Sequence, residues 1–179
     1  MNKIRHYRGL DMTDFVTCRG NLDRGFIGLE DIVDFCIDNV KPTDTVLELG
    51  TFKGASTVVF AHYARQVISV DIDNRINNNI TKCNNILLIQ CDSRLVYKLF
   101  PHKFYNVLYV DSVHTYEHLK EELRTLVPLA IEGARIGGHD YITDIHDPEF
   151  QRSPQIIKAV DEFCEGKPSK IYKFGSWVR

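Results

Sequence analysis

The segment Val46–Thr57, VLELGTFKGAST, decides which fold this sequence can adopt. It opens with a short apolar run, turns at Gly50 and again at Gly54, and continues into small residues that can begin a helix. A buried strand that passes through a glycine turn into a helix is how many nucleotide-binding domains begin. The rest of the chain decides whether such a domain follows and which molecule lies on the turn.

Length and composition are those of one ordinary globular domain. The 179 residues are 44% hydrophobic and 26% charged, and they fit a single domain over 1–179, with a polar arm or lid at 1–24 and a core at 25–179. The net charge of -2 gives no reason to expect nucleic acid or an anionic membrane as a partner. No apolar run approaches the ~20 residues that span a bilayer, and the N-terminus lacks the apolar core of a secretory signal. The five cysteines are scattered without a CxxC pair, which favours reduced thiols and a cytoplasmic location.

Apolar runs and helix-like segments alternate along the chain after residue 44. The runs are continuous, which is the pattern of strands covered on both faces. Strands are expected in Thr45–Leu49, Gln66–Asp71, Ile86–Cys91, Asn106–Asp111 and Ala134–His139. Helices are expected in Gly28–Asn39, Ser56–Tyr63, Asn74–Cys83, Ser93–Leu99, Thr115–Leu129 and Pro154–Cys164, with a final strand or hairpin in Lys170–Val178. This order predicts an α/β fold: a Rossmann-like, doubly wound, mostly parallel sheet with helices on both faces and an antiparallel edge from the C-terminal tail.

Each expected parallel strand ends in or beside a carboxylate. In chain order these acids are Glu48, Asp71, Asp92, Asp111 and Asp140. A single acid is common at such a place, because acids cap helices and suit helix N-termini. Five of them at the edge where open parallel sheets bind their ligands predict an acidic mouth to a binding site.

The first turn helps to choose the ligand. It reads GTFKG, a GxxxG pattern that differs from the GxGxxG of dinucleotide sites, and no GK[ST] motif follows it. Phosphate-bearing ligands are held by amides, glycines and cations, so an acidic mouth does not suit them. A cationic, phosphate-free ligand with ribose hydroxyls suits it better. S-adenosylmethionine, which combines a sulfonium, an amino acid and an adenosine, is the ligand that these residues favour.

Roles for the turn and the strand ends follow from this ligand. Gly50 and Gly54 let the backbone approach the methionine part, and Glu48 supports the loop. Asp71 is expected to accept hydrogen bonds from the ribose hydroxyls, and Asp92 from the adenine amine. The full set of expected cofactor-binding residues is Glu48, Gly50, Thr51, Phe52, Gly54, Ser56, Asp71, Ile72, Asp92, Ser93 and Asp111.

Five segments together resemble the class I S-adenosylmethionine-dependent methyltransferases. They are VLELGTFKGAST, VISVDID, LLIQCDS, VLYVDSVHTYEHLKEEL and EGARIGGHDY, and they occur in the family's order between Asp44 and Phe163. The stretch VDSVHTYEHLKEEL followed by GGHDY is similar to small-molecule and sugar O-methyltransferases with a D-x-x-H segment, here Asp111 to His114. The resemblance implies methyl transfer to a hydroxyl of a small molecule or sugar.

The resemblance also implies catalytic residues and a metal. In metal-dependent relatives the two strand-end aspartates bind a divalent ion, which carries that role to Asp111 and Asp140, with Mg²⁺ as the candidate ion. The histidine of D-x-x-H resembles a general base, so the expected catalytic residues are His114, Asp111 and Asp140. One position departs from the pattern: those relatives usually follow the second aspartate with Asp or Asn, whereas this chain has Tyr141, a poor magnesium ligand.

Other functions remain open on the sequence alone. They are a non-catalytic S-adenosylmethionine-binding protein, a dinucleotide-dependent oxidoreductase of related fold, and a methyltransferase that modifies a polymer. The chain has no N/D-P-P-Y/F segment after Asp111 and no basic patch interleaved with aromatic residues, which favours a small hydroxyl acceptor over nucleic acid. Because the chain is short, a second subunit that closes the acceptor pocket, and hence a homo-oligomer, is one option. A solvated helix face is expected for Lys120, Glu121, Glu122 and Arg124.

Overall fold

The computed structural model describes residues 6–8, 10–11, 29–73, 80, 83–144, 151 and 153–179. Within these ranges a two-stranded antiparallel hairpin, β1 (His6–Tyr7) and β2 (Leu10–Asp11), precedes the main domain. The helices of the main domain are α2 (Leu29–Asn39), α3 (Ala55–Tyr63), α4 (Tyr116–Leu126) and α5 (Ser153–Cys164), with 3₁₀ helices η3 (Ser93–Lys98) and η4 (Val127–Leu129). Its strands are β3 (Thr45–Leu49), β4 (Gln66–Asp71), β5 (Ile86–Gln90), β6 (Tyr105–Val110), β7 (Ala130–Gly138), β8 (Lys170–Ile171) and β9 (Trp177–Val178).

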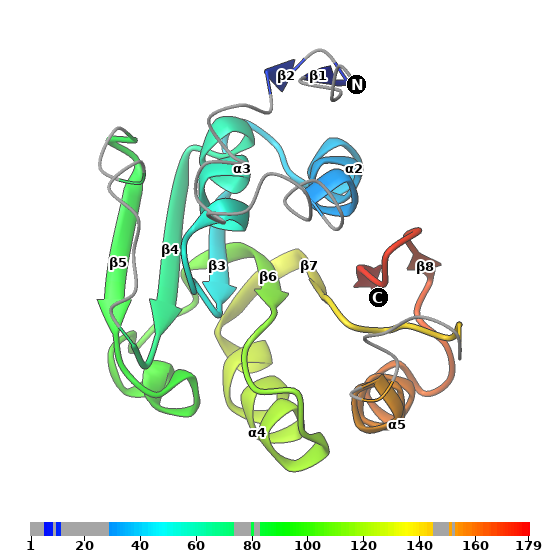
Figure 1. Ribbon diagram of the computed structural model, residues 1–179. Helices are drawn as coiled ribbons and strands as arrows, with labels where there is room; N and C mark the ends of the chain where they lie inside the picture. Colours follow the sequence, from blue (N-terminus) through cyan, green and yellow to red (C-terminus); the bar gives the residue numbers. More distant parts are fainter. Residues whose placement is uncertain are drawn as a thin grey trace.

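The strands of the main domain form one seven-stranded sheet in the order β5-β4-β3-β6-β7-β9-β8. Strands β3 to β7 are parallel, and β9 and β8 join antiparallel at the edge beyond β7. The chain runs outward from β3 through β4 to β5 and then returns to place β6 on the other side of β3 (Figure 1). Ligands of open parallel sheets bind outside the carboxyl ends of the strands at such a reversal. Here the reversal lies between Gly50 and Asp111, whose backbone amide donates to the Leu49 carbonyl at 2.8 Å.

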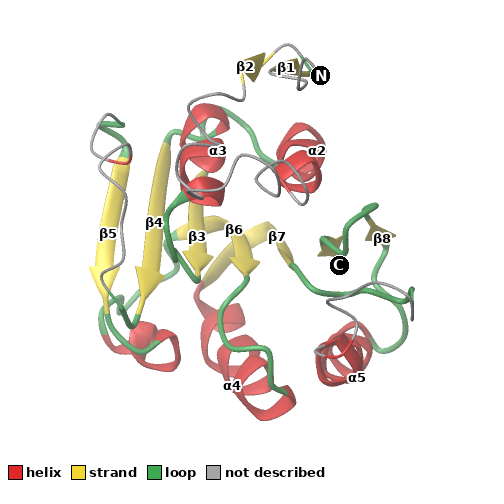
Figure 2. Ribbon diagram, viewed as in Figure 1, coloured by secondary structure: helices red, strands yellow, loops and turns green. Residues whose placement is uncertain are grey.

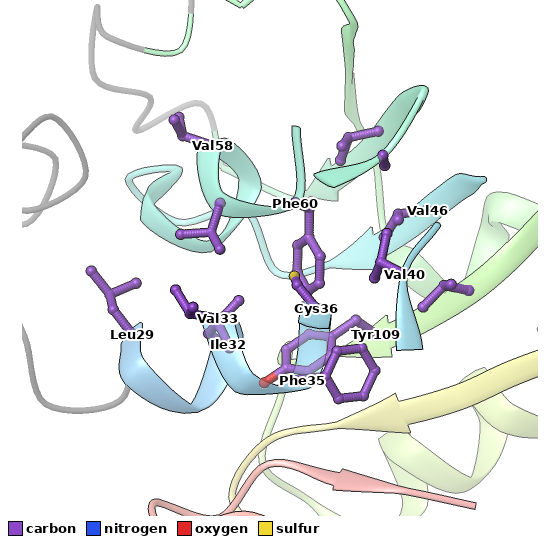
Figure 3. Packing of buried hydrophobic residues seen from close by; sticks show 14 of the residues in the cluster. Leu29, Ile32, Val33, Phe35, Cys36, Val40, Val46, Val58, Phe60 and Tyr109 are labelled. Atoms are coloured by element: carbon purple, nitrogen blue, oxygen red, sulfur yellow. The ribbon is translucent and has the colours of Figure 1, made fainter. Parts of the chain in front are cut away.

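Helices cover both faces of this sheet (Figure 2). On one face α2 and α3 pack over Val46 and Tyr109, and Figure 3 shows Phe35 of α2 beside the Tyr109 ring, with ring centroids 4.9 Å apart. On the other face α4 and α5 pack over Leu47 and Leu108. Because successive side chains of a strand point to opposite faces, two covered faces require continuous apolar strands. Packing between two layers of helices therefore explains why the sequence of these strands is continuously apolar.

The C-terminal tail is attached closely to β7. Strand β9 pairs with β7 so that the fully buried Trp177 lies opposite Gly138. A Cβ at Gly138 would lie 3.1 Å from the indole Nε1 of Trp177 and 2.4 Å from a backbone carbonyl oxygen of β6, so this approach needs glycine. Asp31 of α2 adds a second attachment, because its Oδ2 accepts hydrogen bonds from the backbone amides of Phe174 and Ser176 at 2.8 and 2.9 Å.

The fold class predicted from the sequence is confirmed, with local differences. Ser93–Lys98 is a 3₁₀ helix, and β7 begins at Ala130, four residues before the expected start. The early part of β7 contains a register shift against β6, where Gly133 takes a φ of 73°. The expected helix 74–83 and the arm 1–24 lie largely outside the described residues. Among the helices in the described ranges, none has both the length and the apolarity needed to cross a membrane.

Candidate active site

The turn after β3 has a backbone that requires glycine. Gly50 has a φ of 96° and Gly54 a φ of 84°, both in the left-handed region. A Cβ at Gly50 would lie 1.9 Å from the carbonyl oxygen of Asp111, so the turn lies directly against the end of β6. Phe52 also has a positive φ, 47°, which is uncommon for an aromatic residue. The predicted glycine turn is therefore a tightly folded loop at the reversal of strand order.

Glu48 lies beneath this turn, away from the mouth. Its carboxylate is fully buried and accepts hydrogen bonds of 2.5 Å from the hydroxyls of Ser56, Thr57 and Ser69. Since the single proton of Ser69 points to Glu48, the Thr51 hydroxyl donates to Ser69, at 2.6 Å. Burial raises the pKa of Glu48 to about 7, although the three hydroxyl donors act to lower it. The expected acidic mouth therefore lacks Glu48, which supports the loop from inside.

Asp71 and a group of apolar side chains line the mouth beside the turn. Asp71, at the end of β4, accepts hydrogen bonds from the backbone amides of Phe52 at 2.7 Å and of Asp73 at 2.9 Å. Each of its oxygens keeps a lone pair for a further donor such as a ribose hydroxyl. The side chains of Ile72, Phe52 and Val113, which follow three neighbouring strands, are exposed, and 65% of Ile72 is accessible. A carboxylate with acceptor capacity beside exposed apolar groups fits an adenosine.

The end of β5 differs from the arrangement that the sequence suggests. Asp92 caps η3, and the backbone amide and guanidinium of Arg94 both donate to its carboxylate. These hydrogen bonds lower the pKa of Asp92 to about 2. Ser93 is buried and donates to Glu122 of α4, and its hydroxyl lies 3.0 Å from His118 Nε2. Contacts of Asp92 and Ser93 with adenine stay predictions, and both side chains already have protein partners.

The prediction that Glu122 belongs to a solvated face of α4 is wrong. It is fully buried, because it lies at the helical spacing of Leu119, Leu123 and Leu126 and so shares their apolar face. That spacing is the signal in the sequence from which its burial could have been predicted. Besides Ser93, it accepts a hydrogen bond of 2.6 Å from Ser112. Glu122 thus ties the segment that follows β6 to α4.

His114 lies between two carboxylates at the ends of β6 and β7. Its Nε2 is 2.7 Å from Asp140 Oδ2 and 3.5 Å from Asp111 Oδ1. These are ion-pair distances, but the ring nitrogen is not aligned for hydrogen bonding, and Nε2 has no hydrogen-bond partner among the described residues. The close approach of Asp111 and of Asp140 outweighs burial and raises the pKa of His114 to about 10. The structure therefore brings together the three residues that the sequence predicts to be catalytic.

His139 joins this cluster from the end of β7. Asp140 has a φ of 64°, and the His139 Nδ1 lies 3.1 Å from Asp140 Oδ1. One possible ligand atom each from Asp111, His139 and Asp140 lies within 4.8 Å of the other two, a spacing that one metal ion can bridge. Tyr141 points away, and its hydroxyl donates to Asp161 of α5 at 2.7 Å. Sequence reasoning missed His139 as a metal ligand because strand alternation places neighbouring residues on opposite faces.

Fold and site together define a class of protein. A parallel sheet that reverses between β3 and β6, a glycine turn at the reversal and an acceptor at the end of β4 characterise a class I S-adenosylmethionine-dependent methyltransferase. A profile described as a methyltransferase domain matches residues 47–141, just over half of the chain, and the chain belongs to that family. S-adenosylmethionine is the methyl donor of the class, and the groups at the ends of β3 and β4 fit it.

Solved structures of similar fold include methyltransferases described with different activities. The apo TDP-rhamnose 3'-O-methyltransferase of calicheamicin biosynthesis matches with a TM-score of 0.61 at 15% identity, over 93% of this chain and 90% of that one. A putative methyltransferase from Streptococcus mutans in complex with SAH matches with a TM-score of 0.59 at 11% identity, over 84% and 94%. A putative rRNA methylase from Clostridium thermocellum matches with a TM-score of 0.58 at 18% identity, over 84% and 94%. At these identities the likeness shows the fold and leaves the methyl acceptor open.

Proposed function

We propose that this protein transfers a methyl group from S-adenosylmethionine to a hydroxyl of a small molecule or sugar, with His114 as the base and with assistance from a divalent ion at Asp111 and Asp140. The observation that carries the proposal is the position of His114 between these carboxylates, at strand ends beside the Gly50 turn. Asp71 at the end of β4 lies on one side of that turn and the His114 cluster on the other, an arrangement that supports this proposal. In this proposal the methyl group of S-adenosylmethionine is held at the turn, and the acceptor hydroxyl binds between that methyl group and His114.

The chemistry of a hydroxyl acceptor explains why such a cluster is needed. An alcohol is a weak acid, so its oxygen attacks efficiently only when a base removes the proton during transfer. Bound S-adenosylmethionine supplies an electrophilic methyl group on a sulfonium that is a good leaving group. In its neutral form His114 takes the hydroxyl proton at Nε2 as the bond from oxygen to methyl forms and the bond from sulfur to methyl breaks, which leaves S-adenosylhomocysteine. Because Asp111 and Asp140 raise the pKa of His114 to about 10, this neutral form is reached at alkaline pH or when a cation neutralises the two carboxylates. In the protonated form the same nitrogen lies 2.7 Å from Asp140 Oδ2, and this ion pair holds the imidazole between the two strand ends.

The carboxylates give the cluster a second capacity. A cation held by Asp111 and Asp140 would act as a Lewis acid towards the acceptor hydroxyl and would compete with the imidazole for the same carboxylate oxygens. His114 Nε2, which lies 2.7 Å from Asp140 in the described structure, would then lose its ion pair and become available as a proton acceptor. The residues present therefore fit a metal-assisted reaction.

Net charge and fold likeness bear on the type of acceptor. The net charge of -2 does not favour binding of a nucleic acid backbone, and the fold likeness to a TDP-rhamnose methyltransferase agrees with a sugar hydroxyl. The likeness to a putative rRNA methylase makes methylation of a polymer the main rival.

The proposal is tested by turnover of the purified chain. S-adenosylhomocysteine formation is measured with a panel of nucleotide sugars, catechols and a structured RNA, with and without divalent ions. The variants His114→Gln and Asp140→Asn should each lower turnover about 10²- to 10⁴-fold, the range for loss of general-base catalysis, while calorimetry shows unchanged S-adenosylmethionine affinity. His62→Gln, at an exposed histidine of α3, is the matched control. Turnover that survives both site changes refutes the assigned roles, and methylation of the RNA alone would establish the rival acceptor.

A further inference from the structure

His139 and Asp140 are neighbours in sequence whose side chains meet. At the end of a regular strand they would point to opposite faces of the sheet. The left-handed conformation of Asp140, with a φ of 64°, breaks this alternation and brings its carboxylate to 3.1 Å from His139 Nδ1. An aspartate tolerates this conformation better than most residues, though it remains uncommon. The backbone therefore turns two neighbouring polar side chains towards Asp111.

The residue after Asp140 is turned the other way. Tyr141 is buried, and its hydroxyl is committed to Asp161 on α5. It therefore brings no oxygen to the cluster at the ends of β6 and β7. The donor that accompanies the two aspartates is instead an imidazole nitrogen of His139, within 4.8 Å of one oxygen of each.

We propose that Asp111, His139 and Asp140 form a site for a divalent first-row transition ion such as Mn²⁺, Fe²⁺, Co²⁺ or Zn²⁺, in preference to Mg²⁺. Mg²⁺ is bound almost entirely through oxygen, whereas an imidazole beside two carboxylates is a ligand set for transition ions. The two carboxylates balance the charge of a divalent ion. This inference rests on the metal site of the proposed function, but it does not depend on the identity of the acceptor.

The exposure of the two aspartate ligands suits an ion that also binds a substrate oxygen. The Asp140 side chain is 11% exposed, so this ligand is fixed within the protein, whereas Asp111 is 27% exposed and leaves one side open. Catalytic metal sites keep such an open position for water or substrate. His114, which is 2.7 Å from Asp140, stands beside the site as the base and needs no place among the ligands.

The test measures metal binding without S-adenosylmethionine or acceptor, so that its outcome is independent of methyl transfer. The full chain is treated with a chelator, and MnCl₂, CoCl₂ and MgCl₂ are titrated by calorimetry. Electron spin-echo envelope modulation of the Mn²⁺ complex then reports whether a nitrogen is bound to the ion. The variants are His139→Gln, His114→Gln and the remote control His62→Gln, each checked for folding by thermal unfolding.

The expected result is one Mn²⁺ per chain, bound at least about 10-fold more tightly than Mg²⁺, with a nitrogen signal. The signal and the affinity should persist in His62→Gln and His114→Gln, and His139→Gln should lose the signal together with about 10-fold or more in affinity. Absence of metal binding, Mg²⁺ binding as tight as Mn²⁺, or a nitrogen signal that disappears with His114 each overturns the proposal. If His139→Gln does not fold, the ion preference and the His114→Gln signal still decide the matter. A positive metal result with no transfer to any acceptor would leave this inference standing and reject the proposed function.

Discussion

The buried carboxylate beneath the glycine turn should make stability fall as the pH rises. Burial raises the pKa of Glu48 from 4.5 to about 7. In the unfolded chain the group ionises near its ordinary pKa, so between pH 4.5 and pH 7 the folded protein binds more protons than the unfolded protein. The contribution of the protonated Glu48 carboxyl to stability is therefore fully present below pH 4.5 and is lost as the pH rises through 7. The shift corresponds to about 3 kcal/mol in the free energy of unfolding.

The variant Glu48→Gln isolates this contribution, because it keeps the shape of the side chain and cannot ionise. The free energy of unfolding is measured by urea titration across the window from pH 4.5 to pH 7 and just above it. The wild-type value minus the Glu48→Gln value should fall by about 3 kcal/mol across this window and then level off. Glu117→Gln, at an exposed glutamate of α4, controls for the general effect of the substitution.

The expected fall requires that the burial of Glu48 raises its pKa by more than the three hydroxyl donors lower it. A difference that stays constant across the window would show that Glu48 ionises equally in both states. A difference that grows with pH would show that the hydrogen bonds from Ser56, Thr57 and Ser69 stabilise the charge more than burial opposes it. The pKa of Glu48 would then be lowered on folding, the opposite of the expected direction.

Three further predictions concern backbone approach, the tail and the residue after Asp140. Gly133→Ala should lower the free energy of unfolding by about 1–2 kcal/mol through its positive φ alone. Gly50→Ala should lower it clearly more and weaken S-adenosylmethionine binding, because its Cβ would lie 1.9 Å from a backbone oxygen. Equal losses of stability in urea unfolding would contradict the close approach at Gly50. Asp31→Ala leaves two tail amides without their acceptor and should cost about 2–6 kcal/mol, whereas Asp31→Asn, whose carbonyl can replace the one accepting oxygen, should recover most of it; no recovery would point to a role for the charge. Tyr141→Phe should cost about 1 kcal/mol and leave metal affinity and turnover unchanged; a loss of metal affinity would place the phenol in the site.

The parallel strands were the part of the fold most visible in the sequence. The bounds of β3 and β4 agree with their apolar runs to the residue, because strands buried on both faces cannot include polar interruptions without an internal partner. The same rule explains Glu48: a residue in the middle of such a strand is buried, so its three hydroxyl donors were to be expected somewhere along the chain. The early start of β7 was not visible, because residues 131–134 include a glycine and an acid that resemble a turn.

The candidate site was predictable in its chemistry and less so in its geometry. The D-x-x-H segment and the strand-end aspartates identified His114, Asp111 and Asp140, which the structure brings together. The meeting of the His139 and Asp140 side chains was hidden, because it depends on one dihedral angle at Asp140 that the sequence pattern does not indicate. Partners that arrive from distant segments, such as Glu122 for Ser93, depend on the tertiary structure, and local partners such as Arg94 for Asp92 depend on side-chain rotamers.

The close seam between Gly138 and Trp177 has a consequence for the reacting groups. Strand β7 ends directly before His139 and Asp140 of the candidate site, and its outer edge pairs with the two residues of β9, which come almost 40 positions later in the chain. The pairing of β9 with β7 therefore helps to fix the strand end from which His139 and Asp140 extend. Substitutions in β9 are therefore expected to displace the side chains that follow β7 as well as to lower stability.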